Sequence, residues 1–392
     1  MTLHCISCDH RQPHDPLTFV CPRCGTPLEV LPDPEAFARG GPFEGRGVWR
    51  YRALLPAGRG PTLGEGDTGL HRCERLGLEF GLSTLYVKNE GENPTGSFKD
   101  RGMTVGVALA LGIGARAVAC ASTGNTAASM AAYAARAGIE AIVLVPAGKV
   151  ASGKLSQTVA CGATIAHVEG DFDDAMRLVV ELAARERSLY LLNSINPNRL
   201  EGQKTLAFEV CETLGSAPDV VVLPMGNAGN ISALWKGFKE FQLLGRIERL
   251  PRMIGVQAEG AAPIVRALGD GADACRVERP ETIATAIRIG APVNWKKAVA
   301  AIRESGGEAG TVTDAEILAA QHDLAAREGL FVEPASAAPI AYLRKRGLEG
   351  AGTVVCIATG HGLKDPEVVS RHPARETRVA PGLEALRELI PR

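Results

Sequence analysis

Short apolar segments alternate with longer amphipathic or alanine-rich segments from Leu85 onward. The apolar segments predict strands at residues 85–90, 117–122, 141–146, 164–170, 190–194, 220–226, 253–260 and 353–360. Between them, residues 125–138, 171–187 and 230–245 predict helices. A further helix is expected from Thr313, which forms a capping box with Glu316, to about Gly329. Strands and helices in alternation predict an α/β fold, with a parallel sheet that has helices on both faces.

The first residues differ in composition from the rest of the chain. Residues 1–30 contain two pairs of cysteines, and the Pro/Gly-rich stretch LPDPEAFARGGPFEGRG follows them. We interpret residues 1–30 as a separate extension and residues 31–45 as a linker. Because 392 residues exceed the usual size of a single core, we expect the remainder to form two domains.

The charge balance gives no reason for the chain to attract polyanions. Lys plus Arg number 43 and Asp plus Glu number 44, a net charge of -1, so nucleic acid is not indicated as a partner. The N-terminus lacks a basic region followed by an apolar run, and no long apolar stretch indicates a membrane span. Six cysteines scattered through apolar segments predict buried free thiols. We therefore expect a cytoplasmic protein that does not bind membranes.

Four polar loops follow predicted strands, and they read NPTGSFKDRG (93–102), STGNTAAS (122–129), LPMGNAGNIS (223–232) and IATGHGLKDPE (357–367). In parallel folds, ligands bind at the carboxyl ends of strands, where the next helix begins with free N–H groups. Taken singly, Lys99 could be a surface charge, GNAGN an Asn-Gly turn and STGNTAAS a helix cap. Taken together, two anion sites and one lysine favour pyridoxal phosphate, with its aldehyde on Lys99 and its phosphate on the glycine loop.

These four loops, in this order and spacing, resemble those of the threonine synthases, pyridoxal-phosphate enzymes that share the fold of the tryptophan synthase β-subunit. The resemblance runs from about residue 50 to the C-terminus. It implies a two-domain α/β structure of fold type II, with parallel or mixed sheets flanked by helices. Residues 46–90 and 201–392 would form the large domain and residues 91–200 the small one, with the cofactor between them. It also implies a homodimer.

The resemblance assigns a role to residues in each loop. Lys99 would carry the cofactor as a Schiff base and act as the catalytic residue, Asn125 would contact the ring oxygen, and Thr359 would hydrogen-bond the pyridine nitrogen. The cofactor phosphate would be held by Gly226, Asn227, Ala228, Gly229 and Asn230. The substrate carboxylate would lie on Ser122, Thr123 and Thr126, whose hydroxyls stand at a helix start.

A further polar stretch, NSINPNRLEGQKT (193–205), follows a predicted strand. It gathers amide, hydroxyl and cationic donors, as a second phosphate would require, although a polar loop with an Asn-Pro turn would look the same. The resemblance makes Asn193, Ser194 and Arg199, together with Asn227, the pocket for the substrate's phosphate. Asp100 and Arg101 are interpreted as the structural frame of Lys99. Glu333 and Ser336 are interpreted as a helix start, with a role at an interface as the alternative.

The implied reaction converts O-phospho-L-homoserine and water into L-threonine and phosphate. An enzyme with this activity is a lyase of threonine biosynthesis. The Lys99 amine, with a pKa lowered by burial, would remove the Cα proton. Alternatives with the same fold are a threonine or serine dehydratase and cysteate synthase. An alternative of a different class is a binding module that uses the N-terminal cysteines and has no catalytic activity.

The N-terminal cysteines form two knuckles, Cys5-x2-Cys8 and Cys21-x2-Cys24. This spacing predicts a zinc ribbon, because each knuckle directs two thiolates at one tetrahedral ion. Disulfides are the alternative, and they are rare in a reducing compartment. Four thiolates leave no open position, so the zinc would be structural. The nearby histidines, His4, His10 and His14, are interpreted as surface residues.

Overall fold

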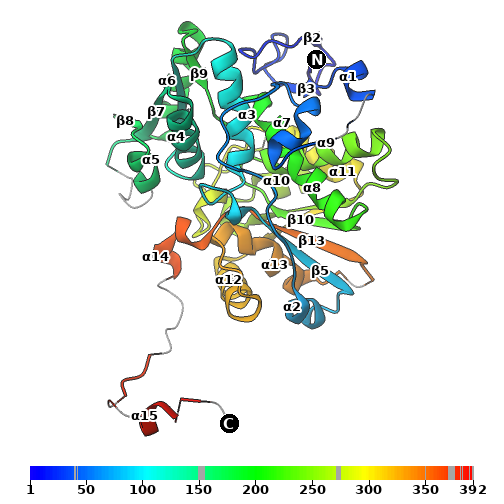
Figure 1. Cartoon of the computed structure of the whole chain (residues 1–392), viewed down its shortest axis with the longest axis vertical. Helices are drawn as coiled ribbons and strands as arrows, with labels where there is room; N and C mark the ends of the chain where they lie inside the picture. The colour runs from blue at the N-terminus through cyan, green and yellow to red at the C-terminus, as the bar shows by residue number, and fades with distance from the viewer. Residues whose placement is uncertain are drawn as a thin grey trace.

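The computed structural model describes residues 1–38, 41, 43–148, 155–270, 275–348, 350–369, 376–379, 381, 383–387 and 389–390. Their strands form a three-stranded, a four-stranded and a six-stranded sheet, and helices flank the two larger ones (Figure 1). Within these ranges no helix is both long enough and apolar enough to cross a membrane. The predicted α/β architecture with parallel and mixed sheets is confirmed.

The four-stranded sheet is parallel and has the strand order β8-β7-β6-β9. Its strands are β6 (Ala117–Ala121), β7 (Glu140–Pro146), β8 (Thr164–Val168) and β9 (Leu189–Leu191). Its helices are α3 (Lys99–Gly112), α4 (Asn125–Ala137), α5 (Ser156–Ala160) and α6 (Phe172–Arg185). Successive strand residues point to opposite faces, so Val118 and Cys120 pack with α3 and α4 while Ala119 and Ala121 pack with α6.

The six-stranded sheet has the order β12-β11-β10-β13-β5-β4 and is parallel except for β4 at its edge. Its strands are β4 (Leu70–Arg72), β5 (Thr84–Asn89), β10 (Val220–Pro224), β11 (Arg252–Ala258), β12 (Glu308–Val312) and β13 (Thr353–Ala358). One face is covered by α8 (Thr205–Leu214), α9 (Gly229–Leu243), α10 (Pro263–Asp270) and α11 (Trp295–Glu304). The other is covered by α2 (Glu74–Glu79), α12 (Asp314–Glu328) and α13 (Pro334–Arg346).

Each of the eight predicted strands is present, with ends that differ by no more than three residues. The predicted capping box is also confirmed, since Thr313 Oγ1 accepts a hydrogen bond from Glu316 N at 3.2 Å, and the helix ends before Gly329 in the left-handed region. In the two larger sheets, β4 and β12 were not predicted: β4 has three residues and lies at a sheet edge, and β12, EAGTV, contains a glycine and lies at the other edge. The three short strands of the N-terminal segment were not predicted either.

The N-terminal segment is a separate small layer against α7 (Pro197–Gln203) (Figure 1). Its antiparallel strands are β1 (Thr2–His4), β2 (Arg11–Pro13) and β3 (Glu29–Leu31), and α1 (Pro34–Ala38) follows. The core of this segment consists of Leu3, Cys5, Cys21, Leu28 and Val30. Two short helices, α14 (Pro366–Val369) and α15 (Leu383–Arg387), lie near the C-terminus.

Candidate active site

Lys99 is the first residue of α3 and lies beside the carboxyl end of β13. Phe98 N donates a hydrogen bond to Thr359 O at 3.0 Å, which joins the lysine loop to the loop after β13. The Lys99 Nζ lies 4.0 Å from the centroid of the Phe98 ring and makes no hydrogen bond or ion pair with any described residue. Burial, with a contribution from the charge of Arg199, lowers the pKa of Lys99 to about 7. A lysine with this pKa is in part a neutral amine near pH 7, which is what a nucleophile or base requires.

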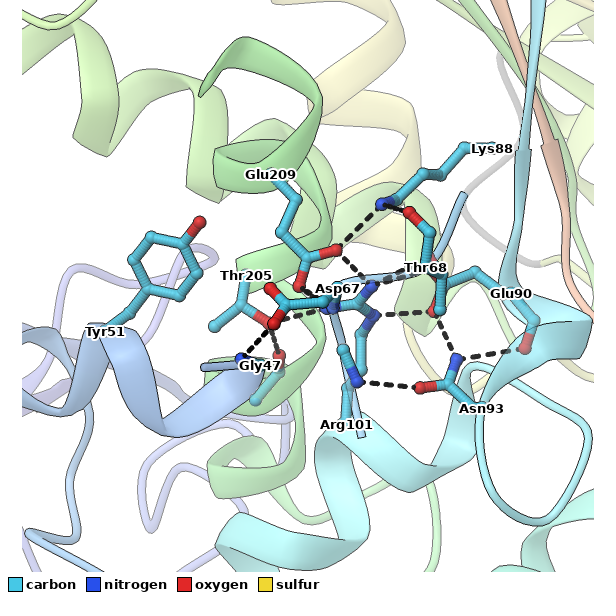
Figure 2. A network of polar contacts seen from close by, with 12 residues as sticks. Gly47, Tyr51, Asp67, Thr68, Lys88, Glu90, Asn93, Arg101, Thr205 and Glu209 are labelled. Atoms are coloured by element: carbon cyan, nitrogen blue, oxygen red, sulfur yellow. Dashed lines mark hydrogen bonds and ion pairs between the residues drawn. The ribbon is translucent and has the colours of Figure 1, made fainter. Parts of the chain in front are cut away.

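Arg101 fixes the start of α3 through two buried carboxylates (Figure 2). Its guanidinium contacts Glu90 at 2.6 and 2.7 Å and Glu209 at 2.6 and 2.7 Å. Lys88 Nζ also donates to Glu209, at 2.8 Å. Because these residues come from β5, the turn after it, α3 and α8, the network joins the elements around Lys99. The interpretation of Arg101 as a structural ion-pair partner is confirmed.

Asp100 fixes the loop that precedes Lys99. Its carboxyl accepts hydrogen bonds from Thr95 N at 2.7 Å, Thr95 Oγ1 at 2.5 Å and Ser129 Oγ at 2.5 Å. Burial raises the pKa of Asp100 to about 6, although these donors oppose the rise. Asp100 therefore ties the loop before Lys99 to α4, the helix that carries the predicted carboxylate contacts.

Two glycines bring Arg199 next to the lysine helix. A Cβ atom on Gly202 of α7 would lie 1.8 Å from the Arg101 carbonyl oxygen, and one on Gly102 would lie 2.7 Å from the Arg199 carbonyl oxygen. Glycine at both positions allows the backbones of α3 and α7 to touch. Arg199 thus lies close enough to Lys99 for its charge to lower the lysine's pKa.

Arg199 is buried and has unused donors. Its Nε and Nη2 atoms have no hydrogen-bond partner among the described residues, and burial lowers its pKa to about 10. A buried guanidinium with free donors can bind an anion. The Asn193 side chain, in contrast, already has partners. Its amide accepts a hydrogen bond from Ala121 N and donates one to Ala121 O, both at 3.0 Å. Ser194 is half-buried, and its carbonyl accepts a hydrogen bond from Asn294 Nδ2 at 3.0 Å.

The glycine loop after β10 has the form of a phosphate cradle. Ala228 has a φ of 62°, and α9 begins directly after it at Gly229. The amide of Asn230 is buried, and neither Oδ1 nor Nδ2 has a partner within the described ranges. A Cβ atom on Gly226 would lie 2.9 Å from the Ala286 carbonyl oxygen, so glycine is needed there. Free N–H groups at the start of α9 and an unpaired amide fit the phosphate of pyridoxal phosphate.

The predicted carboxylate seat lies at the start of α4. Ser122, Thr123 and Asn125 are half-buried there, and Thr126 is buried. Ser122 Oγ accepts a hydrogen bond from Gly124 N at 3.2 Å, which shapes the turn into the helix. No side chain caps this helix, so its first N–H groups remain available to an anion.

Glu333 was assigned to a helix start, yet its carboxyl makes no capping contact. It accepts hydrogen bonds from Asn125 Nδ2 at 3.0 Å and from Thr359 Oγ1 at 3.2 Å, and burial raises its pKa. Ser336 Oγ lies 3.1 Å from Thr359 Oγ1. Glu333 thus joins the two predicted ring contacts, Asn125 and Thr359, a role that sequence reasoning missed. The available signal was a lone carboxylate inside an apolar stretch, VEPASAAP.

The N-terminal cysteines converge as their spacing predicts. The Sγ atoms of Cys5, Cys8, Cys21 and Cys24 all lie within 4.8 Å of one another, and the Cys5–Cys24 and Cys8–Cys21 separations are 3.4 and 3.6 Å. Four sulfurs at these separations fit a tetrahedral Zn²⁺ ion. All ten cysteines are free thiols, and five of the six scattered ones are buried, while Cys161 is half-buried.

The comparisons agree with this geometry. Residues 61–360 match the family model described as "Pyridoxal-phosphate dependent enzyme". The threonine synthase of Methanosarcina acetivorans is 53% identical over 99% of this chain and 98% of that protein, and the threonine synthase of Methanocaldococcus jannaschii is 52% identical over 100% and 99%. The crystal structure of a threonine deaminase from T.th. superposes with a TM-score of 0.62 at 26% identity, covering 75% of this chain and 92% of that one. The chain belongs to the pyridoxal-phosphate-dependent enzyme family and, within it, to the threonine synthases.

Proposed function

We propose that this protein uses pyridoxal phosphate to convert O-phospho-L-homoserine and water into L-threonine and phosphate. The observation that carries the proposal is the position of Lys99 beside Arg199, a partly neutral amine next to a buried guanidinium with unused donors. The Lys99 amine can act as a base, and the nearby Arg199 guanidinium can bind an anion. This pair suits a substrate that reacts at its amino-acid end while its phosphate group stays bound.

When bound, pyridoxal phosphate supplies an electron sink for the substrate's Cα. Lys99 would hold the cofactor, and its Nζ would then take the Cα proton and return it. Gly226, Asn227, Ala228, Gly229 and Asn230 would bind the cofactor phosphate with backbone N–H groups and the free Asn230 amide. Asn125 and Thr359 would contact the ring, both oriented by Glu333.

The substrate would be bound at both of its ends. Ser122, Thr123 and Thr126, at the uncapped start of α4, would receive the carboxylate. Arg199 would receive the phosphate with Nε and Nη2, a charge-assisted contact. Ser194 and Asn227 would add donors from adjacent loops. Asn193 would act mainly by fixing the loop, since its amide is already committed to Ala121.

Loss of a proton from Cβ would expel phosphate from Cγ, and Cγ would then take up a proton to become the methyl group. Water would add at Cβ, and Cα would regain its proton. Thr359 carries no charge, so it would not keep a ring nitrogen protonated, which disfavours transamination. Phosphate release from O-phospho-L-homoserine, with an equal amount of L-threonine, is the expected result. Keto acid from L-threonine as the main activity would indicate a dehydratase, and consumption of O-phospho-L-serine with sulfite would indicate cysteate synthase. Either outcome would contradict the proposal.

We further propose that residues 91–200 form the small domain, residues 46–90 and 201–392 the large domain, residues 31–45 a linker, and residues 1–30 a structural zinc ribbon. The four-stranded sheet lies within the first range and the six-stranded sheet within the second, which supports this division. The resemblance supports a homodimer, and the free thiols support a cytoplasmic location.

A further inference from the structure

The N-terminal segment meets the rest of the chain through buried and partly buried polar contacts. His14 was expected to be a surface residue, and this is wrong. Its ring is half-buried, and its Nε2 donates a hydrogen bond to Asn198 Oδ1 at 2.7 Å. Asn198 Nδ2 returns a bond to the Pro16 carbonyl at 3.4 Å. Asn198 is the neighbour of Arg199 on α7, so this contact holds the turn that carries the phosphate seat.

A second chain of hydrogen bonds connects the segment, at Leu28, to the rest of the protein. Lys297 of α11 is buried, and its Nζ donates to the Leu28 carbonyl at 2.7 Å and to Asn294 Oδ1 at 3.5 Å. Lys297 forms no ion pair with a carboxylate among the described residues. A buried ammonium held only by a carbonyl and an amide depends on the geometry of both, because loss of either leaves it with a single acceptor.

Asn294 links this contact to the phosphate pocket. Its Nδ2 donates to the Ser194 carbonyl at 3.0 Å, and its backbone N–H donates to the Asn227 carbonyl at 3.1 Å. Ser194 and Asn227 are two of the residues proposed to bind the substrate's phosphate. The two paths therefore reach the same pocket, one through Asn198 to Arg199 and one through Lys297 and Asn294.

The segment can hold these contacts only while it is folded. Its core is five residues, and two of them, Cys5 and Cys21, are metal-ligand candidates. Cores this small usually need a metal or disulfides, and zinc knuckles commonly unfold without their ion. Leu28 and Val30, whose carbonyls bind Lys297 and Lys236, belong to the same core. Loss of the metal would therefore release both lysines at once.

We infer that the four-cysteine segment is a brace for the substrate-phosphate pocket, through His14–Asn198 and through Leu28–Lys297–Asn294, so that its metal content sets the affinity for the phosphorylated substrate. This inference rests on the proposed function. Arg199, Ser194 and Asn227 bind phosphate correctly when the segment is folded. Asn227 also belongs to the cofactor loop. Among the described residues, however, Lys99, Asn125 and Thr359, which would hold the cofactor ring, make no hydrogen bond with either path, so we expect the ring contacts to stay unchanged when the brace is lost.

Lys297→Met tests the second path and His14→Leu the first, in the full-length holoenzyme. Lys296→Met is the control, since Lys296 is exposed and reaches Ser7 of the segment at 3.4 Å without a link to Asn294. Calorimetry with inorganic phosphate gives the affinity, and steady-state assays separate KM from kcat. We expect the phosphate Kd and the substrate KM to rise about tenfold in both test variants and to stay within about twofold in the control.

Removing the metal tests the brace as a whole. Cys8→Ser combined with Cys24→Ser removes the two exposed ligands, and metal analysis confirms the loss. We expect the same rise in phosphate Kd, an unchanged visible spectrum of the bound cofactor, and faster amide hydrogen exchange in α7. Hydrogen exchange does not depend on the substrate, so it decides the coupling even if the wild-type protein releases no phosphate and the proposed function fails. Unchanged exchange in α7 and unchanged phosphate affinity, with lower melting temperature alone, would overturn the brace.

Discussion

Glu333 and Asn125 join the two halves of the candidate active site, with Asn125 Nδ2 3.0 Å from Glu333 Oε2 and 3.3 Å from Oε1. Asn125 begins α4 beside the four-stranded sheet, and Glu333 precedes α13 beside the six-stranded sheet. The same carboxyl accepts a hydrogen bond from Thr359. One buried acid thus orients both side chains that are proposed to contact the cofactor ring.

Replacing Glu333 should weaken cofactor binding. Glu333→Ala leaves the Asn125 amide and the Thr359 hydroxyl without this acceptor, a cost of about 1–3 kcal/mol for each buried group left unpaired. We expect the affinity for pyridoxal phosphate to fall about tenfold or more, measured by titrating the apoprotein and following visible absorbance. Glu333→Gln keeps one acceptor oxygen and should lose less. Equal affinity for wild type and Glu333→Ala would show that the carboxyl does not orient these contacts.

The rate of cofactor attachment should depend on pH through the Lys99 amine. The neutral amine attacks the aldehyde, and the pKa of Lys99 is lowered from 10.5 to about 7. The amine is therefore mostly charged below pH 7 and mostly neutral above it. We expect the reconstitution rate of the apoprotein to rise as pH approaches 7 and to level off above it. A rate that keeps rising to about pH 10 would mean an ordinary lysine.

Arg199 should affect both the substrate and the lysine. Arg199→Leu removes the proposed binding site for the substrate's phosphate, and we expect the KM for O-phospho-L-homoserine to rise about 10- to 100-fold. It also removes a positive charge that lowers the pKa of Lys99, so the midpoint of the reconstitution profile should move to higher pH. Arg185→Leu, which breaks an exposed ion pair with Glu181 on α6, is the control. If the KM rises while the pH midpoint of the reconstitution rate stays unchanged, Arg199 does not influence the pKa of Lys99, and this part of the prediction is wrong.

The Arg101 network should dominate the stability of the site. Arg101→Met leaves Glu90 and Glu209 as buried carboxylates that have lost a partner, which typically costs about 3–5 kcal/mol. We expect the free energy of unfolding to fall by this amount. Denaturant titration of the two-state transition that includes α3 measures it. Arg185→Met should cost less than about 0.5 kcal/mol, because its ion pair is exposed to solvent. Similar losses for the two variants would contradict the structural role of Arg101.

The sequence predicted the loops better than it predicted how they meet. Strand and helix periodicity placed Lys99, Asn125, Gly226 and Thr359 at strand ends, and strand ends of a parallel sheet lie at one edge. The close contact of α3 and α7 depends on Gly102 and Gly202, whose spacing in the sequence carries no sign that they face each other. Tertiary packing of this kind joins residues that are far apart along the chain.

Single polar residues were the hardest to interpret. Glu333 looked like helix-start chemistry because it precedes a Pro-initiated helix, and its partners Asn125 and Thr359 come from elsewhere in the chain. His14 was interpreted as a surface residue because four cysteines suffice to bind a zinc ion, and its partner Asn198 is far along the chain. The cysteine pairs were easier, since a CxxC knuckle specifies its ligands within one turn.

The lysine that carries the cofactor decides whether the proposed active site is correct. Borohydride reduction of the holoenzyme makes the bond between lysine and cofactor permanent, and peptide mass analysis then identifies the labelled residue. We predict about one label per chain, on the peptide that contains Lys99. Lys364 is the alternative, because burial also lowers its pKa and Glu333 and Asp100 lie near enough to affect its charge. A label on Lys364, or on any peptide without Lys99, would contradict the assignment on which the proposed mechanism depends.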